Sequence, residues 1–389
     1  MSALVAVVAW GPEFAGALTR VWEAGDAVLP VDPRLPAGAV TDVLEAMAPA
    51  WLCDPRAGSG TERRAHGRPA AAGDALVVAT SGTTGTPKGV VLTHAAVAAS
   101  ARATSARLGV DPNGDEWIAC LPLAHVGGLS VLTRAVLTGT PCAVTDGFDA
   151  AEVAAVAASM RARGRRPLVS LVATALARVD PGAFGVIVLG GSAPPPTVPP
   201  NAVVTYGMTE TGSGVVYDGV ALDGVEVRIE AGEIWLRGPM LARAYRTAEG
   251  ESPLVDGLGW LATGDAGTVG PDGRLAVSGR LAEVIVTGGE KVWPAPVEAA
   301  LRHHAGVADV AVVGAPDETW GQRVVAVVEA SDPDHPPSLA ALRETVRERL
   351  APYAAPRQLV VVAALPRTAL GKVRRQALGP LVEAAQSEP

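Results

Sequence analysis

Lysine is scarce in this chain. Of the 32 basic residues only three are lysines, Lys88, Lys291 and Lys372, and the remaining 29 are arginines. A coding preference for arginine explains such a bias. It also makes each lysine a position where a compact, flexible ammonium group is needed in place of a planar guanidinium. The positions of the three lysines therefore provide an independent test of any site that is proposed from motifs.

Cysteine is equally scarce. Cys53, Cys120 and Cys142 are the only three, and they are widely spaced. This number and spacing exclude a disulfide framework and a cysteine-based metal cluster, because both need several cysteines in a recognisable pattern. We expect three reduced and mostly buried thiols.

The chain also lacks the features of nucleic-acid-binding and membrane proteins. Its net charge is −8, which repels polyanions, and no lysine-rich stretch offsets that charge. Residues 1–10, MSALVAVVAW, are apolar but contain no basic residue, and Gly11-Pro12-Glu13 interrupts the run. A signal peptide needs a basic start, and a membrane span needs a longer apolar run. We expect a cytoplasmic protein with no membrane span and no nucleic-acid partner.

The length and composition indicate an ordered protein with more than one domain. A chain of 389 residues exceeds what one hydrophobic core usually organises, so about two domains are expected. Apolar residues make up 49% of the chain and charged residues 19%, which is typical of globular proteins. The 44 glycines and 32 prolines stay below the ~25–30% of the chain that indicates low complexity.

Short apolar runs alternate with alanine-rich stretches through residues 1–280. Continuous apolar runs between helices indicate buried, largely parallel strands. We therefore predict a large α/β domain of mostly parallel sheets flanked by helices. Its predicted strands include 75–79, 117–121, 168–172 and 186–189, and its predicted helices include 95–107 and 150–163.

The pattern changes near residue 280, and residues 281–389 are predicted to form a small α+β domain, within the usual size range of a domain. The sequence contains no internal repeat. The expected elements of the small domain are strands at 284–286, 310–313 and 324–329 and helices at 295–304 and 339–350.

The segment TSGTTGTPKG, residues 80–89, is the strongest chemical signal. It follows a predicted strand and precedes a predicted helix. Glycines allow close approach of an anion to the backbone, hydroxyl groups donate hydrogen bonds, and a lysine adds positive charge. The segment is not a Walker loop, because Lys88 is followed by glycine and not by Ser or Thr. A flexible surface loop is the alternative. The phosphate-binding candidates are Thr80, Ser81, Gly82, Thr83, Thr84, Gly85 and Lys88.

Residue for residue, this segment resembles the signature of the adenylate-forming superfamily, which includes acyl-CoA synthetases, luciferases and the adenylation domains of peptide synthetases. Further motifs of that family follow in the expected order and extend the resemblance over most of the chain. Lys88 lies in the 80–89 segment, and the other two lysines, Lys291 and Lys372, fall within the further motifs. These motifs are YGMTET at 206–211, GWLATGD at 259–265, SGR at 278–280, GGEKV at 288–292 and PRTALGKVRR at 366–375.

The resemblance implies a role for each motif in binding ATP. Tyr206 would stack on adenine, Thr209 would contact phosphate, and Glu210 would supply an oxygen ligand to Mg²⁺. Asp265 would bind both ribose hydroxyls, and Arg280 would lie near ribose and phosphate, although an isolated arginine is more often a surface charge. Lys372 would bridge the substrate carboxylate and the α-phosphate. The resemblance also places Gly190, Gly191, Gly207 and Met208 in the nucleotide site.

The family performs two half-reactions. A carboxylate attacks the α-phosphate of ATP to give acyl-AMP and pyrophosphate, and a thiol such as that of CoA then takes the acyl group and releases AMP. The small domain rotates between the steps and opens a CoA tunnel near Gly288 and Gly289. The usual Asp or Lys of the hinge is Ala282 here. His125 matches a residue that gates this tunnel, with a buried core histidine as the alternative.

The expected acyl site is similar to that of the 2-succinylbenzoate–CoA ligases of menaquinone synthesis. Segments 125–134, 170–174 and 216–227 carry this resemblance. Such a substrate has a second carboxylate, which Arg134 would bind, with Ser130 and Gly128 nearby. A rim arginine that pairs with a surface acid is the alternative for Arg134.

Other functions remain open at this point. They are a ligase for another aromatic or short-chain acid, an adenylation enzyme that loads a carrier protein, and a non-catalytic nucleotide-binding relative. No carrier domain follows Pro389, which weakens the second of these. The basic run 161–166 is either a contact for the CoA phosphates or a solvated helix end. A homodimer is one option for the oligomeric state.

Overall fold

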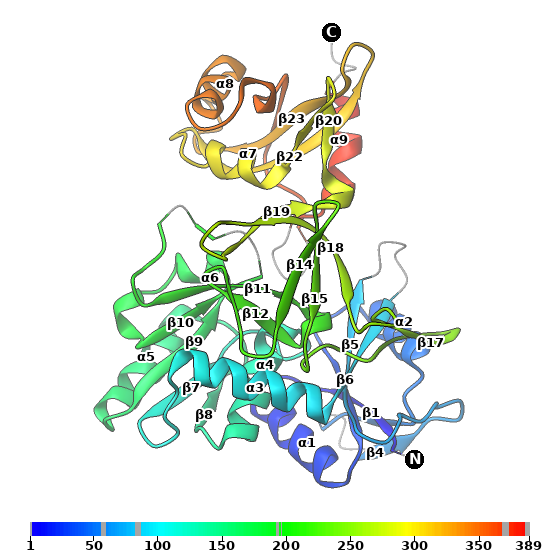
Figure 1. Cartoon of the computed structure of the whole chain (residues 1–389). Helices are drawn as coiled ribbons and strands as arrows, with labels where there is room; N and C mark the ends of the chain where they lie inside the picture. Colours follow the sequence, from blue (N-terminus) through cyan, green and yellow to red (C-terminus); the bar gives the residue numbers. More distant parts are fainter. Residues whose placement is uncertain are drawn as a thin grey trace. The chain divides into compact units, whose positions relative to one another are not determined.

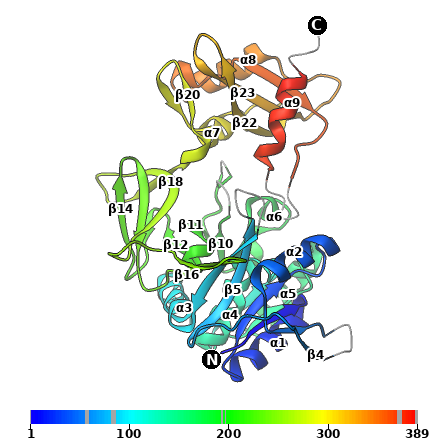
Figure 2. The same cartoon turned by 90° about the vertical axis from the view of Figure 1, so that its right-hand side faces the viewer.

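The computed structural model describes residues 2–55, 60–81, 87–191, 194–195, 197–367 and 373–385 (Figures 1 and 2). The chain forms two compact units. Each unit is made of several segments of the chain, so the units do not correspond to single sequence ranges. The predicted boundary between residues 280 and 281 stays a prediction. Unit 1 comprises Met1–Gly191, Pro199–Arg228 and Trp235–Ala262, and unit 2 comprises Ser192–Val198, Ile229–Ile234 and Thr263–Pro389.

A seven-stranded sheet forms one half of unit 1, in the order β13-β12-β11-β10-β9-β7-β8. The strands from β11 to β8 are parallel, and β12 and β13 are antiparallel additions at one end. Three of the predicted strands correspond to β7, β9 and β10. The bounds are β7 (Asp115–Ala119), β8 (Cys142–Val144), β9 (Arg166–Leu171), β10 (Val186–Leu189), β11 (Ala202–Met208), β12 (Ser213–Tyr217) and β13 (Val220–Ala221).

An eight-stranded sheet forms the other half, in the order β17-β16-β6-β5-β2-β1-β3-β4. Its centre is parallel and its ends are antiparallel. The predicted strand at 75–79 is confirmed as β5. The bounds are β1 (Leu4–Val8), β2 (Ala27–Val31), β3 (Trp51–Cys53), β4 (Thr61–Arg63), β5 (Asp74–Ser81), β6 (Pro87–Thr93), β16 (Ala244–Thr247) and β17 (Gly250–Pro253).

Helices separate and cover these two sheets. Side chains on one face of β1 and β7, such as Val5 and Trp117, share a core with helices α1, α3 and α4, which therefore lie between the sheets. The other face of the eight-stranded sheet packs against α2. The other face of the seven-stranded sheet packs against α5 and α6 (Figure 1). The bounds are α1 (Gly11–Glu23), α2 (Ala37–Met47), α3 (His94–Leu108), α4 (Val126–Thr138), α5 (Ala150–Ala162) and α6 (Ala173–Leu176).

One prediction about the phosphate loop is wrong. Residues 80–89 were expected to connect a strand to a helix, but strand β6 precedes α3, so the segment connects two antiparallel strands, β5 and β6. Pro87 and Gly89 begin β6 and conceal it in the sequence, although Val90 and Val91 are fully buried. The segment therefore does not end at a helix N-terminus, because β6 lies between it and α3.

A four-stranded sheet, in the order β14-β15-β18-β19, has no counterpart in the sequence-based prediction. Its strands are β14 (Glu226–Glu230), β15 (Glu233–Arg237), β18 (Leu261–Val269) and β19 (Leu275–Arg280). Strands β18 and β19 are antiparallel, and their register pairs Asp265 with Arg280.

The rest of unit 2 is the predicted α+β fold. Strands β20, β21, β22, β23 and β24 form one sheet. Helices α7 and α8 pack on one face of it, and α9 packs on the other (Figure 2). The bounds are β20 (Ile285–Thr287), β21 (Glu290–Val292), β22 (Val307–Asp317), β23 (Gly321–Ala330), β24 (Gln358–Val362), α7 (Pro294–Leu301), α8 (Leu339–Arg347) and α9 (Leu378–Ala384).

None of the helices in the described ranges combines the length and the apolar character that crossing a membrane would require.

Candidate active site

Several predicted site residues lie at one edge of the seven-stranded sheet. Strands β7, β9, β10 and β11 are parallel, so their carboxyl ends meet at this edge, which is where open α/β sheets bind ligands. Gly190 and Gly191 directly follow β10. Residues 206–208 end β11, and the turn Thr209–Thr211 follows. The fold thus brings these candidates to a common edge.

Lys88 and Glu210 are 122 positions apart in sequence and lie close together in unit 1. Lys88 Nζ lies 3.5 Å from Glu210 Oε1. The phenol of Tyr245 on β16 donates a hydrogen bond to the same carboxylate oxygen at 2.9 Å. Lys88 Nζ also lies 3.8 Å from the centroid of the Tyr245 ring, a cation–π contact. Tyr245 therefore holds both the predicted phosphate-binding lysine and the predicted metal-binding carboxylate.

Sequence reasoning missed Tyr245. It lies in a stretch without a recognised motif, and its only signal is that it is one of four tyrosines in the chain. Its position results from antiparallel pairing of β16 with β6, which places Tyr245 opposite Val90.

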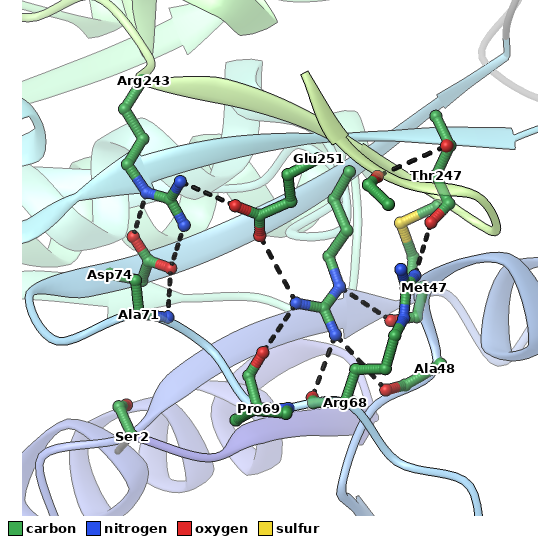
Figure 3. A network of polar contacts seen from close by, with 12 residues as sticks. Ser2, Met47, Ala48, Arg68, Pro69, Ala71, Asp74, Arg243, Thr247 and Glu251 are labelled. Atoms are coloured by element: carbon green, nitrogen blue, oxygen red, sulfur yellow. Dashed lines mark hydrogen bonds and ion pairs between the residues drawn. The ribbon is translucent and has the colours of Figure 1, made fainter. Parts of the chain in front are cut away.

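A network of arginines and acids anchors β16 next to Tyr245. The guanidinium of Arg243 binds both oxygens of the buried Asp74 at 2.7 Å and binds Glu251 at 2.7 Å (Figure 3). Arg246 is also buried, and it donates to the carbonyl oxygens of Met47, Pro69 and Arg68 at 2.9, 2.8 and 2.9 Å. These bonds fix the strand that carries Tyr245.

Two glycines of the predicted site are required by backbone packing. A Cβ at Gly207 would lie 2.2 Å from the carbonyl oxygen of Ser213, and one at Gly128 would lie 2.3 Å from the carbonyl oxygen of Leu121. No side chain fits at these distances. Both positions therefore require glycine for the close approach of two backbone segments.

Both ends of the segment 80–89 belong to the strands of a hairpin, since β5 ends at Ser81 and β6 begins at Pro87. The hydroxyl of Thr80 donates to the carbonyl oxygen of Lys88 at 3.2 Å, and the register pairs these two residues. Ser81 ends β5. Gly82, Thr83, Thr84, Gly85 and Lys372 lie outside the described residues.

Asp265 and Arg280 form a second group, within unit 2. Asp265 is buried, and its Oδ1 lies 3.0 Å from Arg280 Nε. Arg280 Nη1 also donates to the carbonyl oxygen of Thr263 at 3.0 Å. Because these bonds hold Arg280 against β18, it is not an isolated surface charge.

Arg134 on α4 is buried, with an exposed fraction of 1%. Its Nη2 donates to Ser213 Oγ at 3.3 Å, and its guanidinium carbon lies 4.8 Å from the centroid of the Trp117 ring. Within the described part of the chain, Nε and Nη1 have no hydrogen-bond partner. Burial lowers the pKa of Arg134 below its ordinary value. The alternative of a rim arginine that pairs with a surface acid is therefore wrong, because Arg134 is fully buried.

The other two acyl-site candidates, Ser130 and Gly128, lie on α4 itself. Ser130 is buried on α4, and its carbonyl oxygen accepts a bond from Thr133 Oγ1 at 3.4 Å. His125 immediately precedes α4 and is half-buried. Burial raises the pKa of Asp32, but bonds from Arg34 and, to a smaller extent, the charge of His125 lower it overall. The gating role of His125 stays a prediction.

The predicted hinge and tunnel residues occupy turns of unit 2. Ala282 lies in the turn Leu281–Glu283 between β19 and β20. Gly288 and Gly289 lie between β20 and β21 and have positive φ angles of 60° and 85°. A side chain at Gly288 would also collide with the ring of Trp320, which lies 2.7 Å from the point that a Cβ would occupy.

The basic run 161–166 is engaged within unit 1. Arg163 pairs with Glu116 at 3.1 Å, and Arg166 binds Asp115 through two bonds at 2.7 and 2.8 Å. Arg161 and Arg165 donate to backbone carbonyl groups. These contacts favour a structural role over binding of CoA.

Comparisons with known proteins identify the family. The family model of the AMP-binding enzymes matches residues 54–246, and that of the AMP-binding enzyme C-terminal domain matches residues 296–372. A probable 2-succinylbenzoate–CoA ligase of Mycobacterium tuberculosis (strain H37Rv) is 46% identical over 325 residues, covering 78% of this chain and 83% of that protein. The chain belongs to the AMP-binding enzyme family. The predicted adenylate-forming superfamily is thus confirmed.

Further relatives of this AMP-binding enzyme carry the same name. A 2-succinylbenzoate–CoA ligase of Geobacillus kaustophilus is 36% identical and covers 79% of this chain and 69% of that protein. Among solved structures, the o-succinylbenzoate CoA synthetase (MenE) of Bacillus subtilis in complex with the acyl-adenylate intermediate OSB-AMP is similar, with a TM-score of 0.82 and 27% identity. The match covers 97% of this chain and 88% of that one. These matches also confirm the fold class, a large α/β domain followed by a smaller one.

Proposed function

We propose that this enzyme is an ATP-dependent acid–thiol ligase that activates 2-succinylbenzoate for menaquinone synthesis. In the first half-reaction a carboxylate oxygen attacks the α-phosphorus of ATP, and pyrophosphate leaves. In the second, the CoA thiol, on losing its proton, attacks the acyl carbon, and AMP leaves. The relatives named 2-succinylbenzoate–CoA ligase and the solved structure with OSB-AMP support this assignment.

The observation that carries the choice of acid is the environment of Arg134. A buried guanidinium with two unused donor nitrogens among the described residues is costly unless an anion binds there. 2-Succinylbenzoate has two carboxylates, of which only one is activated. The other can accept charge-assisted hydrogen bonds from Arg134, whose Nε and Nη1 have no partner among the described residues. A monocarboxylic acid would leave these donors unpaired.

For the nucleotide, the proposal keeps the roles given by the family motifs. Lys88 supplies positive charge to the phosphates, Tyr206 stacks on adenine, and Asp265 binds the ribose hydroxyls. Lys372 bridges the two reacting groups during adenylation, where fixed charge stabilises the transition state. Thr209 contributes a hydroxyl donor to phosphate.

Glu210 fits a Mg²⁺ ion that arrives with ATP. Mg²⁺ is commonly bound by one or two carboxylates together with substrate phosphates. In the described residues no cluster of three or more His, Cys, Asp or Glu side chains could hold a metal by itself. A single carboxylate positioned by Tyr245 agrees with a shared metal, which would neutralise phosphate charge.

The proposal includes CoA as the second substrate, entering near Gly288 and Gly289 after a rotation about Ala282. It also includes a cytoplasmic location, since three free thiols suit a reducing compartment. A homodimer remains part of the proposal, and sedimentation of the purified protein would test it.

The central experiment supplies purified enzyme with Mg²⁺, ATP, CoA and a panel of mono- and dicarboxylic aromatic acids, and measures AMP and acyl-CoA. We expect thioester formation with 2-succinylbenzoate and little with benzoate. The variant Arg134→Leu should lose this selectivity, while the exposed Arg163→Leu should keep it. Equal turnover of monocarboxylic acids by the wild type, or unchanged selectivity in Arg134→Leu, would count against the assignment.

A further inference from the structure

The guanidinium of Arg134 lies where three elements of unit 1 meet. Helix α4, which carries Arg134, packs against both β7 and β12. On β7, the centroid of the Trp117 ring lies 4.8 Å from the guanidinium carbon. On β12, Ser213 Oγ accepts a hydrogen bond from Arg134 Nη2 at 3.3 Å. Two elements other than its own helix therefore hold the guanidinium group.

The sheet fixes the position of Trp117. Strand β7 lies inside the seven-stranded sheet, where Trp117 is opposite Cys142 on one side and Leu168 on the other. The side chain is fully buried. A large side chain in a close-packed interior has little freedom to change its rotamer. The ring therefore presents a fixed surface to the guanidinium, and the attraction between a cation and an aromatic ring is stronger away from water.

Backbone contacts fix the position of Ser213. Its carbonyl oxygen accepts a hydrogen bond from the hydroxyl of Thr211 at 2.6 Å, and that hydroxyl in turn accepts the backbone N–H of Met208 at 2.9 Å. The same carbonyl oxygen lies so close to Gly207 that no Cβ fits between them. Ser213 is thus tied to the segment 206–211, and its hydroxyl has a defined place.

These two contacts determine the directions in which Arg134 can donate hydrogen bonds. A guanidinium is planar, and its five N–H groups point in fixed directions. Once Nη2 is bonded to Ser213 and the group lies against the Trp117 ring, the directions of Nε and Nη1 are set. These are the two nitrogens without a partner in the described part of the chain. A guanidinium that is oriented beforehand binds a carboxylate more tightly, because less freedom is lost on binding.

We propose that Trp117 and Ser213 are positioning residues, which orient Arg134 toward the second carboxylate of the acid. This inference rests on the proposed function, since it takes Arg134 as the group that binds that carboxylate. Neither Trp117 nor Ser213 has to touch the substrate. Both act through Arg134, so their replacement should matter only in an enzyme that has this arginine.

Double-mutant cycles test this dependence. Ser213→Ala and Trp117→Phe are each made in the wild type and in Arg134→Leu, and kcat and KM for 2-succinylbenzoate are measured at saturating MgATP and CoA. Trp117→Phe keeps an aromatic ring in the core, which preserves folding, but phenylalanine attracts a cation less strongly than tryptophan. Ser100→Ala, at another buried serine, on α3, is the matched control.

We expect both variants to raise the KM for the acid and to leave kcat and the KM for MgATP unchanged. Loss of a hydrogen bond to a charged group corresponds to about a tenfold loss of affinity at the lower end of its range, which is the increase in KM expected for Ser213→Ala. Trp117→Phe should raise KM by about threefold. In Arg134→Leu, each additional substitution should change kcat/KM by less than about twofold, because the interaction it removes is already absent. Ser100→Ala should retain the wild-type KM.

A second pair of cycles, on the free energy of unfolding in urea, does not depend on activity. The losses caused by Arg134→Leu and by each of the other two substitutions should be non-additive, as expected for residues in contact. Additive losses of stability would overturn the inference. Equal effects on kcat/KM with and without Arg134 would also overturn it, even if the unfolding cycles show coupling.

Failure of the proposed function gives a different pattern. A wild-type enzyme that forms no thioester from 2-succinylbenzoate would refute that function, as would an unchanged KM for this acid in Arg134→Leu alone. The unfolding cycles would still decide whether Trp117 and Ser213 hold Arg134 in place.

Discussion

The substitution Tyr245→Phe tests whether the contact with Glu210 prepares the enzyme for MgATP. The change removes the hydroxyl that donates to Glu210 Oε1 at 2.9 Å and keeps the ring that lies 3.8 Å from Lys88 Nζ. Tyr245→Leu removes both contacts. The two variants thus separate orientation of the carboxylate from orientation of the lysine.

The magnitude follows from burial. A hydrogen bond to a charged group contributes ~1.5–3 kcal/mol. Lys88 and Glu210 have side-chain exposed fractions of 34% and 13%, so the lower end applies. About 1.5 kcal/mol corresponds to about a tenfold loss. A partly exposed cation–π contact adds ~0.5–1 kcal/mol, so Tyr245→Leu should lose a further factor of about two to five.

Initial rates of acyl-CoA formation at varied MgATP measure the effect. We expect kcat/KM for MgATP to fall by about tenfold in Tyr245→Phe, with unchanged KM values for the acid and CoA. Tyr353→Phe, at an exposed tyrosine of unit 2, is the matched control. If Tyr245→Phe and Tyr245→Leu both retain the wild-type kcat/KM for MgATP, the reasoning is refuted.

Three further predictions concern catalysis, stability and pH. Lys372→Ala should abolish adenylation and spare thioester formation from supplied acyl-AMP; equal damage to both steps would contradict its role. Arg246→Leu should lower the free energy of unfolding by ~3–5 kcal/mol, because buried carbonyl groups lose their donor, and urea denaturation would measure this. Burial alone would raise the pKa of Asp115, but bonds from Arg166 lower it from 3.8. Its stabilising effect is therefore present above pH 3.8 and lost as the pH falls through the lowered pKa, so the Tm difference between wild type and Asp115→Asn should vanish in strong acid.

The buried parallel strands were predictable, and the antiparallel additions were not. Strand β10 matches its prediction residue for residue, because a strand buried on both faces reads as a continuous apolar run. The short strands β14 and β19 have partly exposed faces and no such run. Predicted helices in unit 2 extend too far at their C-termini: α7 ends at Leu301 and α8 at Arg347. Periodicity alone does not fix where a helix ends.

The site was predictable where a motif carries it and not where tertiary packing creates it. The residues 206–210 were identified from their order in the chain, and the structure places them at the edge of the sheet where its parallel strands end. Tyr245 was missed because strand pairing alone brings it to Glu210. Arg134 was identified as a candidate, but its complete burial was not predicted. Arginine side chains are mostly exposed, and the sequence of α4 contains no feature that indicates a buried one. The roles of Lys372 and Gly82–Gly85 stay predictions.

Strands β5 and β6 form a hairpin, and this pairing determines how the connection between them can vary in length. Residues 82–86 connect neighbouring antiparallel strands whose pairing begins with Ser81 opposite Pro87. For a long flexible loop, each doubling of length costs only ~0.6 kcal/mol in closure entropy. We therefore expect a change of length between Ser81 and Pro87 to leave β5 and β6 in the same register, because the strand pairs themselves set that register.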